Sequence, residues 1–194
     1  MGHSFSILSD IIKKRRSVKP AQMNRKIIPD EQVNQLLELA NWAPTHANTE
    51  PWRFIIYGGL NAKEFCLQHA ELYKRSTSPE HFLQADYDKL LHNGDHVSHI
   101  IIAVMQRGKL PRIPVIEETA ATAAAIQHIL LGATALDIAS FWSTGGMTHR
   151  PELKIFLELK DEDVVMGMLF LGYTDITHEG KRIIPMSEKI SWVI

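Results

Sequence analysis

Hydrophobic residues repeat along this chain at two spacings, one typical of helices and the other typical of buried strands. Apolar positions three and four residues apart predict helices over residues 6–14, 29–43, 61–75, 116–137 and 151–159. Runs of β-branched and aromatic residues predict strands over residues 52–57, 99–105, 138–142 and 164–171. The polar stretch 79–93 is either a helix or a loop, and residues 174–194 form a tail that is first polar and then apolar.

Helices and strands alternate, so the expected fold class is α/β or α+β, with a sheet that helices cover on both faces. The composition favours one compact domain over residues 1–194, because 45% of the residues are hydrophobic and 22% are charged, as in globular proteins. No repeat, low-complexity tract or interdomain linker interrupts the chain.

Charge and cysteine content exclude several functional classes. The formal net charge of −1 argues against a dedicated nucleic-acid binder, and Cys66 as the single cysteine excludes an internal disulfide or a multi-cysteine zinc site. The ten histidines include no HExxH pattern, so no metal site is expected. The longest apolar run, residues 164–173, is too short to span a membrane, and the N-terminus does not resemble a secretory signal. We therefore expect a cytoplasmic protein without membrane or nucleic-acid partners.

A cluster of cations follows the first predicted helix. Arg15, Arg16 and Lys19 lie within five residues, with the hydroxyl of Ser17 between them. Arginine binds phosphate oxygens bidentately, and a dianion needs more than one positive partner, so the segment suits a phosphate monoester. The alternative is that these cations only interact with the negative end of the helix dipole.

Two further segments are candidates for ligand contacts. Residues 43–52 form a turn bracketed by two prolines, which could present His46, Asn48 and backbone groups to a planar polar ring. Residues 141–146 form a strand end with Gly145 and Gly146, and glycine allows a backbone N–H to approach a ligand closely. The alternatives are an ordinary helix-to-strand connection and a plain turn.

Taken together, these segments resemble the flavin-dependent nitroreductase family, in particular its compact subgroup of short chains. The RRSVK box, the APTHANTEPW turn before a strand, the glycine turn after a late strand and a basic tail occur in the family's order over nearly the whole chain. Glu50 departs from the family pattern, which usually has glutamine there. The resemblance implies a three-layer sandwich, with a central mixed sheet flanked by helices and an extended C-terminal tail.

The resemblance also implies how flavin mononucleotide (FMN) would be held. Arg15 and Ser17 match family positions that contact the phosphate and the ribityl chain, and Arg16 belongs to the same box. Lys181 or Arg182 matches the tail cation that contacts the phosphate.

Other matched positions concern the flavin ring. Lys19 matches the cation near N1 and O2, Asn48 the amide beside the pyrimidine edge, and His46 a flavin contact of the subgroup. Ser143, Thr144 and Gly145 match the turn that faces the ring near N5. A flavin carries out its own hydride transfer, which agrees with the absence of any recognisable catalytic triad or acid–base pair in the sequence.

The function implied is an FMN-dependent oxidoreductase that uses NADH or NADPH to reduce a nitro compound or a similar small acceptor by ping-pong turnover. The alternatives are another chemistry on the same scaffold (dehalogenation, azoline oxidation or flavin fragmentation) and a flavin-binding protein with little turnover. The resemblance further implies a homodimer with FMN at the subunit interface. The apolar end of the tail, residues 191–194, and the alanine-rich segment 116–137 suit such a partner.

Overall fold

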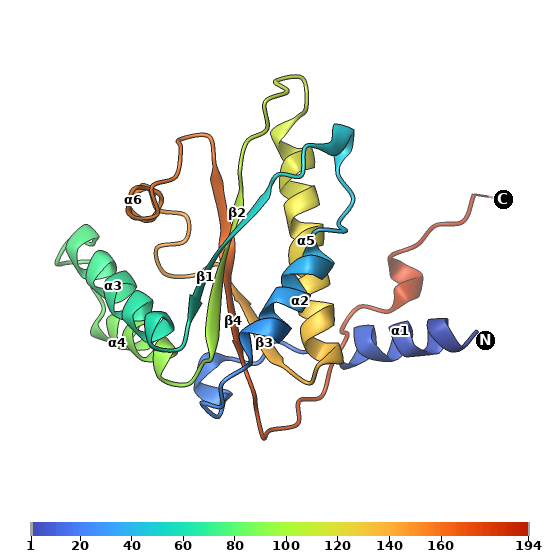
Figure 1. Cartoon of the computed structure of the whole chain (residues 1–194), viewed down its shortest axis with the longest axis horizontal. Helices are drawn as coiled ribbons and strands as arrows, with labels where there is room; N and C mark the ends of the chain where they lie inside the picture. The colour runs from blue at the N-terminus through green and yellow to red at the C-terminus, as the bar shows by residue number, and fades with distance from the viewer. Residues whose placement is uncertain (1, 194) are drawn as a thin grey trace.

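The computed structural model describes residues 2–193 and contains every helix and strand that the sequence predicts (Figure 1). The helices are α1 (His3–Lys14), α2 (Asp30–Ala40), α3 (Leu60–Ser76), α4 (Gln84–His92), α5 (Val115–Ala135) and α6 (Pro151–Phe156). The strands are β1 (Trp52–Gly58), β2 (His99–Met105), β3 (Ala139–Ser143) and β4 (Val164–Gly172). Short 3-10 turns are η1 (Pro20–Gln22), η2 (His46–Asn48), η3 (Asn93–Asp95) and η4 (Met186–Glu188). The ambiguous polar stretch 79–93 begins as a loop and continues as α4.

The four strands form one sheet in the order β1-β2-β4-β3, and each pair of neighbours is antiparallel. The sheet is therefore antiparallel rather than mixed as expected, and the parallel pairing is an isolated bridge between Ser17 and Ser140. There the Val18 N–H donates to the Ser140 carbonyl at 2.9 Å. This bridge fixes the RRSVK segment alongside β3. The RRSVK segment and β3, the strand that leads to the glycine turn, therefore lie side by side.

Helices cover both faces of the sheet, which gives the expected three layers. Helices α2 and α5 lie on one face, and α3, α4 and α6 lie on the other (Figure 1). Strand β2 is buried along its whole length, which explains the continuous apolar run that follows His99. Ile101 packs with the α2–α5 core, whereas Ile100 and Ile102 pack with the core that contains Phe65 and Cys66 of α3. Burial raises the pKa of Cys66 to about 12, so this thiol is inert, as the sequence predicts.

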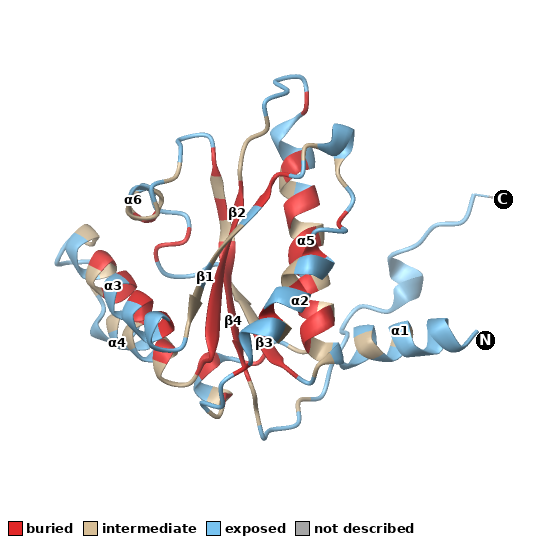
Figure 2. Cartoon of the chain, viewed as in Figure 1, coloured by how far each residue is buried: buried red, intermediate tan, exposed pale blue. Residues whose placement is uncertain are grey.

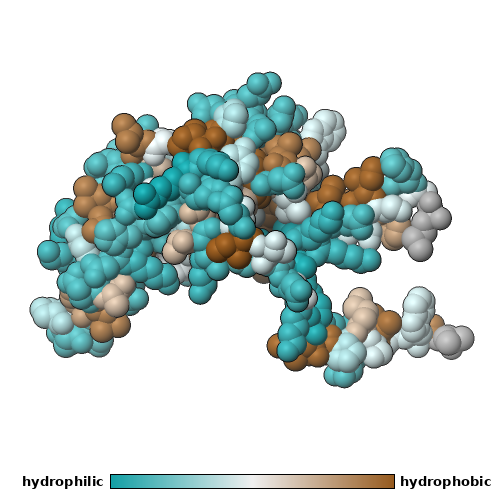
Figure 3. All heavy atoms as spheres, turned by 90° about the horizontal axis from the view of Figure 1, so that it is seen from below, coloured by the Kyte–Doolittle hydropathy of each residue, from teal (hydrophilic) through white to brown (hydrophobic). Residues whose placement is uncertain are grey.

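Two segments extend from one side of this body as exposed arms. Helix α1 has no buried residue, and residues 179–193 of the tail are all exposed (Figure 2). The arms nevertheless carry large apolar side chains: Phe5 is 61% exposed and Trp192 is 83% exposed (Figure 3). Residues 2–193 leave these side chains largely uncovered, which is uncommon for large apolar groups on a monomer.

Among residues 2–193, no helix combines the length and the hydrophobicity that crossing a membrane requires. Within the same range, no three histidine, cysteine or carboxylate side chains come close enough together to bind a metal ion.

Candidate functional site

A cavity of about 300 Å³ lies between the sheet and helices α3 and α4; we call it the Lys19 cavity. Strand alternation explains its floor, because Phe141 and Ser143 share one face of β3 and lie beside Met168 and Phe170 of β4. The rest of the wall comes from η1, α3, α4, η3 and the glycine turn, and consists of Lys19, Pro20, Ala21, His69, Tyr73, Asp86, Lys89, Leu90, Asn93, Gly145 and Gly146. The structure thus brings three of the candidate residues, Lys19, Ser143 and Gly145, together around one cavity.

Hydrogen bonds fix the turn after β3, in which Thr144 is exposed. The Gly145 N–H donates to Ser143 Oγ at 3.4 Å, and the Thr148 hydroxyl donates to the Gly145 carbonyl at 2.7 Å. Gly146 has a φ of +64°, and a Cβ there would lie 2.9 Å from the His69 ring. Only glycine therefore allows this turn to pass so close to α3.

His69 holds the same turn from the opposite side. The Met147 N–H donates to His69 Nε2 at 3.0 Å in the protein interior. Burial lowers the pKa of His69 to about 4, so the ring is neutral near pH 7 and its Nε2 accepts this bond. The sequence analysis missed His69, although it lies on the buried face of a predicted helix one turn from Phe65 and Cys66.

Arginines from the two ends of the chain meet beside β3; we call Arg15, Arg16 and Arg182 the arginine cluster. Arg16 Nε donates to the His178 carbonyl at 3.2 Å, which holds the tail against the RRSVK box. The tail backbone passes so close that a side chain at Gly180 would collide with the Arg16 guanidinium. Burial lowers the pKa of Arg15, and the charges of Arg16 and Arg182 lower it further, so these cations repel one another.

No carboxylate neutralises the arginine cluster. Within residues 2–193, none of its members is part of an ion pair. Ser17 and Lys181 are exposed beside the cluster in sequence, and Arg182 donates to the Lys181 carbonyl at 3.1 Å. Cations that lie close together without an acidic partner repel one another, and a bound anion would reduce this repulsion. The geometry therefore fits a phosphate group.

His46 and Asn48 lie outside the Lys19 cavity. Their turn, η2, is at the N-terminal end of α5, whereas η1 is at the opposite end of the sheet (Figure 1). His46 Nδ1 is 2.5 Å from Glu117 Oε2 in the first turn of α5. Ala47 and Asn48 have φ values of 50° and 54°, a left-handed conformation that side chains rarely adopt. The turn is therefore strained, exposed and directed away from the cavity of its own chain.

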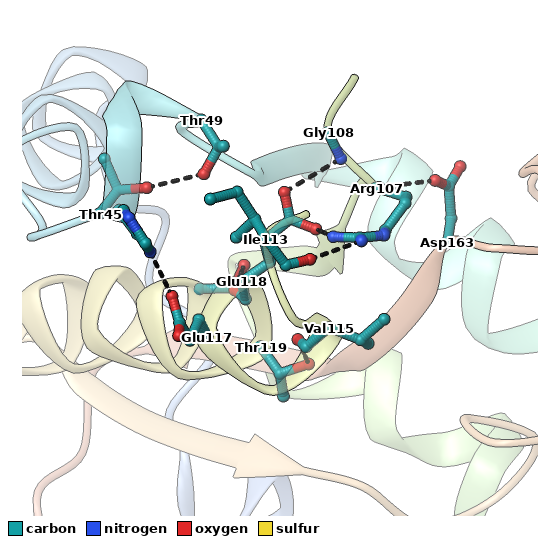
Figure 4. A network of polar contacts seen from close by, with 12 residues as sticks. Thr45, Thr49, Arg107, Gly108, Ile113, Val115, Glu117, Glu118, Thr119 and Asp163 are labelled. Carbon is teal, nitrogen blue, oxygen red and sulfur yellow. Dashed lines mark hydrogen bonds and ion pairs between the residues drawn. The ribbon is translucent and has the colours of Figure 1, made fainter. Parts of the chain in front are cut away.

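A buried ion pair secures the region next to this turn (Figure 4). The Arg107 guanidinium pairs with Glu118, whose side chain is 1% exposed, and it also donates to the Ile113 carbonyl at 2.6 Å. Asp163 Oδ1 accepts a hydrogen bond from the backbone N–H of Arg107 at 3.1 Å. These contacts hold the loop before α5 in place. Of the two neighbouring glutamates of α5, Glu117 contacts His46 and Glu118 contacts Arg107. The sequence analysis did not find this pair, because its members lie on two different elements.

The cavity wall contains further polar residues that the sequence analysis did not identify. Lys89 and Asn93 supply a cation and an amide from the α4–η3 segment, and Tyr73 of α3 supplies a hydroxyl. The only sequence signal for Lys89 and Asn93 was the polar stretch 79–93, which could be read as a loop, and Tyr73 lies in a predicted helix. Asn93, unlike Asn48, lines the cavity of the same chain.

Comparisons with known proteins agree with this architecture. Residues 12–173 match the sequence model of the Nitroreductase family. The Bacillus subtilis (strain 168) protein named "Putative NAD(P)H nitroreductase YfhC" is 25% identical, over 97% of this chain and 95% of its own. A nitroreductase-like family protein from Bacillus cereus superposes with a TM-score of 0.79 at 28% identity, covering 96% of this chain and 95% of that one.

A third relative is similar in fold. The FMN-dependent nitroreductase NfnB from Mycobacterium smegmatis, solved in complex with NADPH, has a TM-score of 0.73 at 18% identity, covering 98% of this chain and all of that one. The family match spans the RRSVK box, the Lys19 cavity and the turn that contains His46. On these grounds, this chain belongs to the nitroreductase family.

Proposed function

We propose that this protein is an FMN-dependent oxidoreductase that uses NADH or NADPH to reduce nitro compounds or similar small acceptors by ping-pong turnover. The observation that carries the proposal is the arginine cluster, in which cations from both ends of the chain gather without a carboxylate. Arg15 and Lys19 are four residues apart, so an extended chain separates them by at most roughly 14 Å. A ligand with a phosphate at one end and a planar ring at the other fits between the cluster and the Lys19 cavity.

Each group of residues then has a distinct task. Arg15, Arg16 and Ser17, with Lys181 or Arg182, hold the phosphate and the ribityl chain. Bound FMN supplies the hydride transfer between the pyridine nucleotide and the acceptor.

Within the cavity, Lys19 stabilises negative charge at the N1–O2 edge of the ring. The turn of Ser143, Thr144 and Gly145 faces N5, and the His69–Met147 hydrogen bond keeps that turn in place. No side chain acts as a catalytic acid or base in this proposal.

The proposed assembly is a homodimer with FMN at the interface. The turn with His46 and Asn48 does not reach the cavity of its own chain, but a second copy could place it over the flavin. The exposed arms support this arrangement. An apolar groove between α1, α2 and α5, lined by residues such as Leu8, Trp42 and Leu131, is also left open by residues 2–193.

The absorption spectrum of the purified protein tests cofactor binding directly. Heat should release a yellow compound with the mass of FMN, and NADH or NADPH should bleach it under anaerobic conditions. A nitroaromatic compound should then restore the colour. Colourless protein that gains no flavin on incubation with FMN would refute the proposal. A bound flavin that neither nucleotide reduces would indicate a flavin-binding protein without this activity.

Lys19→Met is the matching variant for the site, with Lys160→Met as its control, because Lys160 is an exposed lysine outside the cavity. We expect Lys19→Met to slow flavin reduction on the order of tenfold or more, since it removes one preorganised charge. Lys160→Met should behave as the wild type. Equal rates for the two variants would remove Lys19 from the proposed mechanism.

A further inference from the structure

A second cavity, of about 440 Å³, lies directly beside the Lys19 cavity; we call it the Arg150 cavity. The two cavities share Tyr73 and Gly146 in their walls, so they meet at the glycine turn. The remaining lining residues are Thr77, His81, Met147 and Arg150. A ligand in the Lys19 cavity could therefore extend into this second space.

The polar groups in the Arg150 cavity are mainly hydrogen-bond donors. Arg150 is exposed, and within residues 2–193 its guanidinium has no hydrogen-bond or ion-pair partner. The Tyr73 hydroxyl accepts the Leu83 N–H at 3.1 Å, which leaves its own hydrogen free to donate. The Thr77 hydroxyl has no partner in the same range of residues.

Acidic groups are absent from the lining of this cavity. Glu80 is the carboxylate that contacts its wall, with an oxygen 3.9 Å from His81 Nδ1, and both side chains are largely exposed. His81 Nδ1 is also 2.9 Å from the Ser78 hydroxyl. A donor-rich space with an unpaired arginine favours a ligand rich in acceptor oxygens, because arginine binds phosphate and carboxylate groups bidentately.

We propose that the Arg150 cavity binds the anionic group of a substrate that reacts in the Lys19 cavity. The ligand chemistry is a phosphate or a carboxylate, with Arg150 as the principal contact and Tyr73 and Thr77 as donors. The inference rests on the proposed function, since it assumes that both substrates react beside the glycine turn. The anion comes from one of two sources: the phosphates of the pyridine nucleotide or an acidic substituent on the acceptor.

Half-reactions of the FMN-loaded protein separate these sources. For the reductant, NADH and NADPH are compared with 1-benzyl-1,4-dihydronicotinamide, a hydride donor without phosphate. For the acceptor, 4-nitrobenzoate is compared with the neutral 4-nitrobenzamide. The variants are Arg150→Met, which removes the charge, and Arg150→Lys, which keeps it. The control is Arg75→Met, because Arg75 is an exposed arginine of α3 that lines neither cavity.

In at least one of the two comparisons, reductant or acceptor, Arg150→Met should weaken binding of the anionic substrate about ten- to a hundredfold. It should weaken binding of the neutral substrate less than twofold. Arg150→Lys should recover part of the loss, and Arg75→Met should match the wild type. The comparison that responds identifies the source of the anion. Equal effects on charged and neutral substrates in both comparisons, or no effect in either, would overturn the inference. Wild-type protein that reacts with none of the three hydride donors would instead refute the proposed function.

Discussion

Arg107 and the arginine cluster lie in opposite electrostatic environments. Arg107 lies among carboxylates, paired with the buried Glu118 and with its backbone N–H bonded to Asp163. The arginine cluster contains three guanidinium groups, and burial lowers the pKa of Arg15, which the charges of Arg16 and Arg182 lower further. A neutralised arginine needs nothing further from its surroundings, so Arg107 is structural. Cations that repel one another favour a bound anion, which is why we propose that Arg15 and its neighbours bind a phosphate.

The comparison extends to how each group should respond to a ligand. Removing Arg107 leaves the buried Glu118 carboxylate without its partner. Removing Arg15 relieves repulsion in the empty protein and weakens binding only in the loaded one. Removing Arg107 should therefore change mainly protein stability, and removing Arg15 should change mainly ligand affinity.

The largest expected effect follows from breaking the neutralised pair. Arg107→Met should lower the free energy of unfolding by about 3–5 kcal/mol, because Glu118 remains charged and buried. Urea denaturation of the flavin-free protein measures this loss. The double variant Arg107→Met/Glu118→Leu should recover much of it, since no unpaired charge remains. A single variant that loses less than about 1 kcal/mol would contradict the structural role given to the pair.

The next largest effect is the pH dependence of protein stability that His69 causes. The folded protein holds the pKa of His69 near 4, whereas an unfolded chain has a value near 6.5, so unfolded molecules bind the proton first. The stability that the neutral ring contributes is complete above pH 6.5 and is lost as the pH falls towards 4. The loss amounts to about 3 kcal/mol at most.

Urea titrations at pH 7 and pH 4.5 test the contribution of His69 directly. The drop in stability should be smaller in His69→Gln, which keeps a side-chain hydrogen-bond acceptor and does not titrate. The control is His149→Gln, at an exposed position after the same turn, and it should retain the wild-type drop. Identical pH dependence in all three proteins would exclude His69 as the source.

Deleting residues 186–194 tests the role of the C-terminal tail in assembly. The exposed Trp192 and Val193 make no buried contact in their own chain, so their loss should not lower the stability of the body. We expect the dimer to dissociate at least tenfold more readily, a change of about 1.4 kcal/mol, and FMN retention to fall with it. Analytical ultracentrifugation with flavin absorbance measures both quantities. A truncated protein that stays dimeric and yellow would show that the tail has no part in assembly.

The smallest effect is expected at the strained turn beside the Arg107 pair. Ala47 has a φ of 50°, so Ala47→Gly should raise stability by about 0.5–1 kcal/mol. Ala123→Gly, in the middle of α5, is the matched control and should lower stability by about 1 kcal/mol. Thermal denaturation of the two variants should therefore give shifts of opposite sign. A loss of stability in both would mean that the turn is not strained.

Sequence reasoning predicted the elements of this fold well because each has a clear local signal. Strand β2 is an unbroken apolar run, and the small-residue periodicity of α5 marks a helix buried on several sides. Neither the strand order nor the antiparallel pairing is encoded locally, and α4 has too few buried positions to be distinguished from a loop.

The candidate site shows the same division between local and distant information. Lys19, Ser143 and Gly145 were predicted from short motifs, and the structure places them around one cavity. The pairing of Arg107 with Glu118 and of His69 with Met147 depends on contacts between elements, which the sequence does not display. The roles of the predicted residues toward FMN remain predictions.

The most direct test of the central claim is the affinity of the flavin-free protein for FMN and for riboflavin, which lacks the phosphate. The wild type should bind FMN far more tightly than riboflavin. Arg15→Ala should lose about ten- to a hundredfold in affinity for FMN, as expected for a charge-assisted contact, with less than twofold change for riboflavin. Arg75→Ala should match the wild type for both ligands. Equal losses for FMN and riboflavin in Arg15→Ala would contradict the account, because the arginine cluster would then be structural, like Arg107.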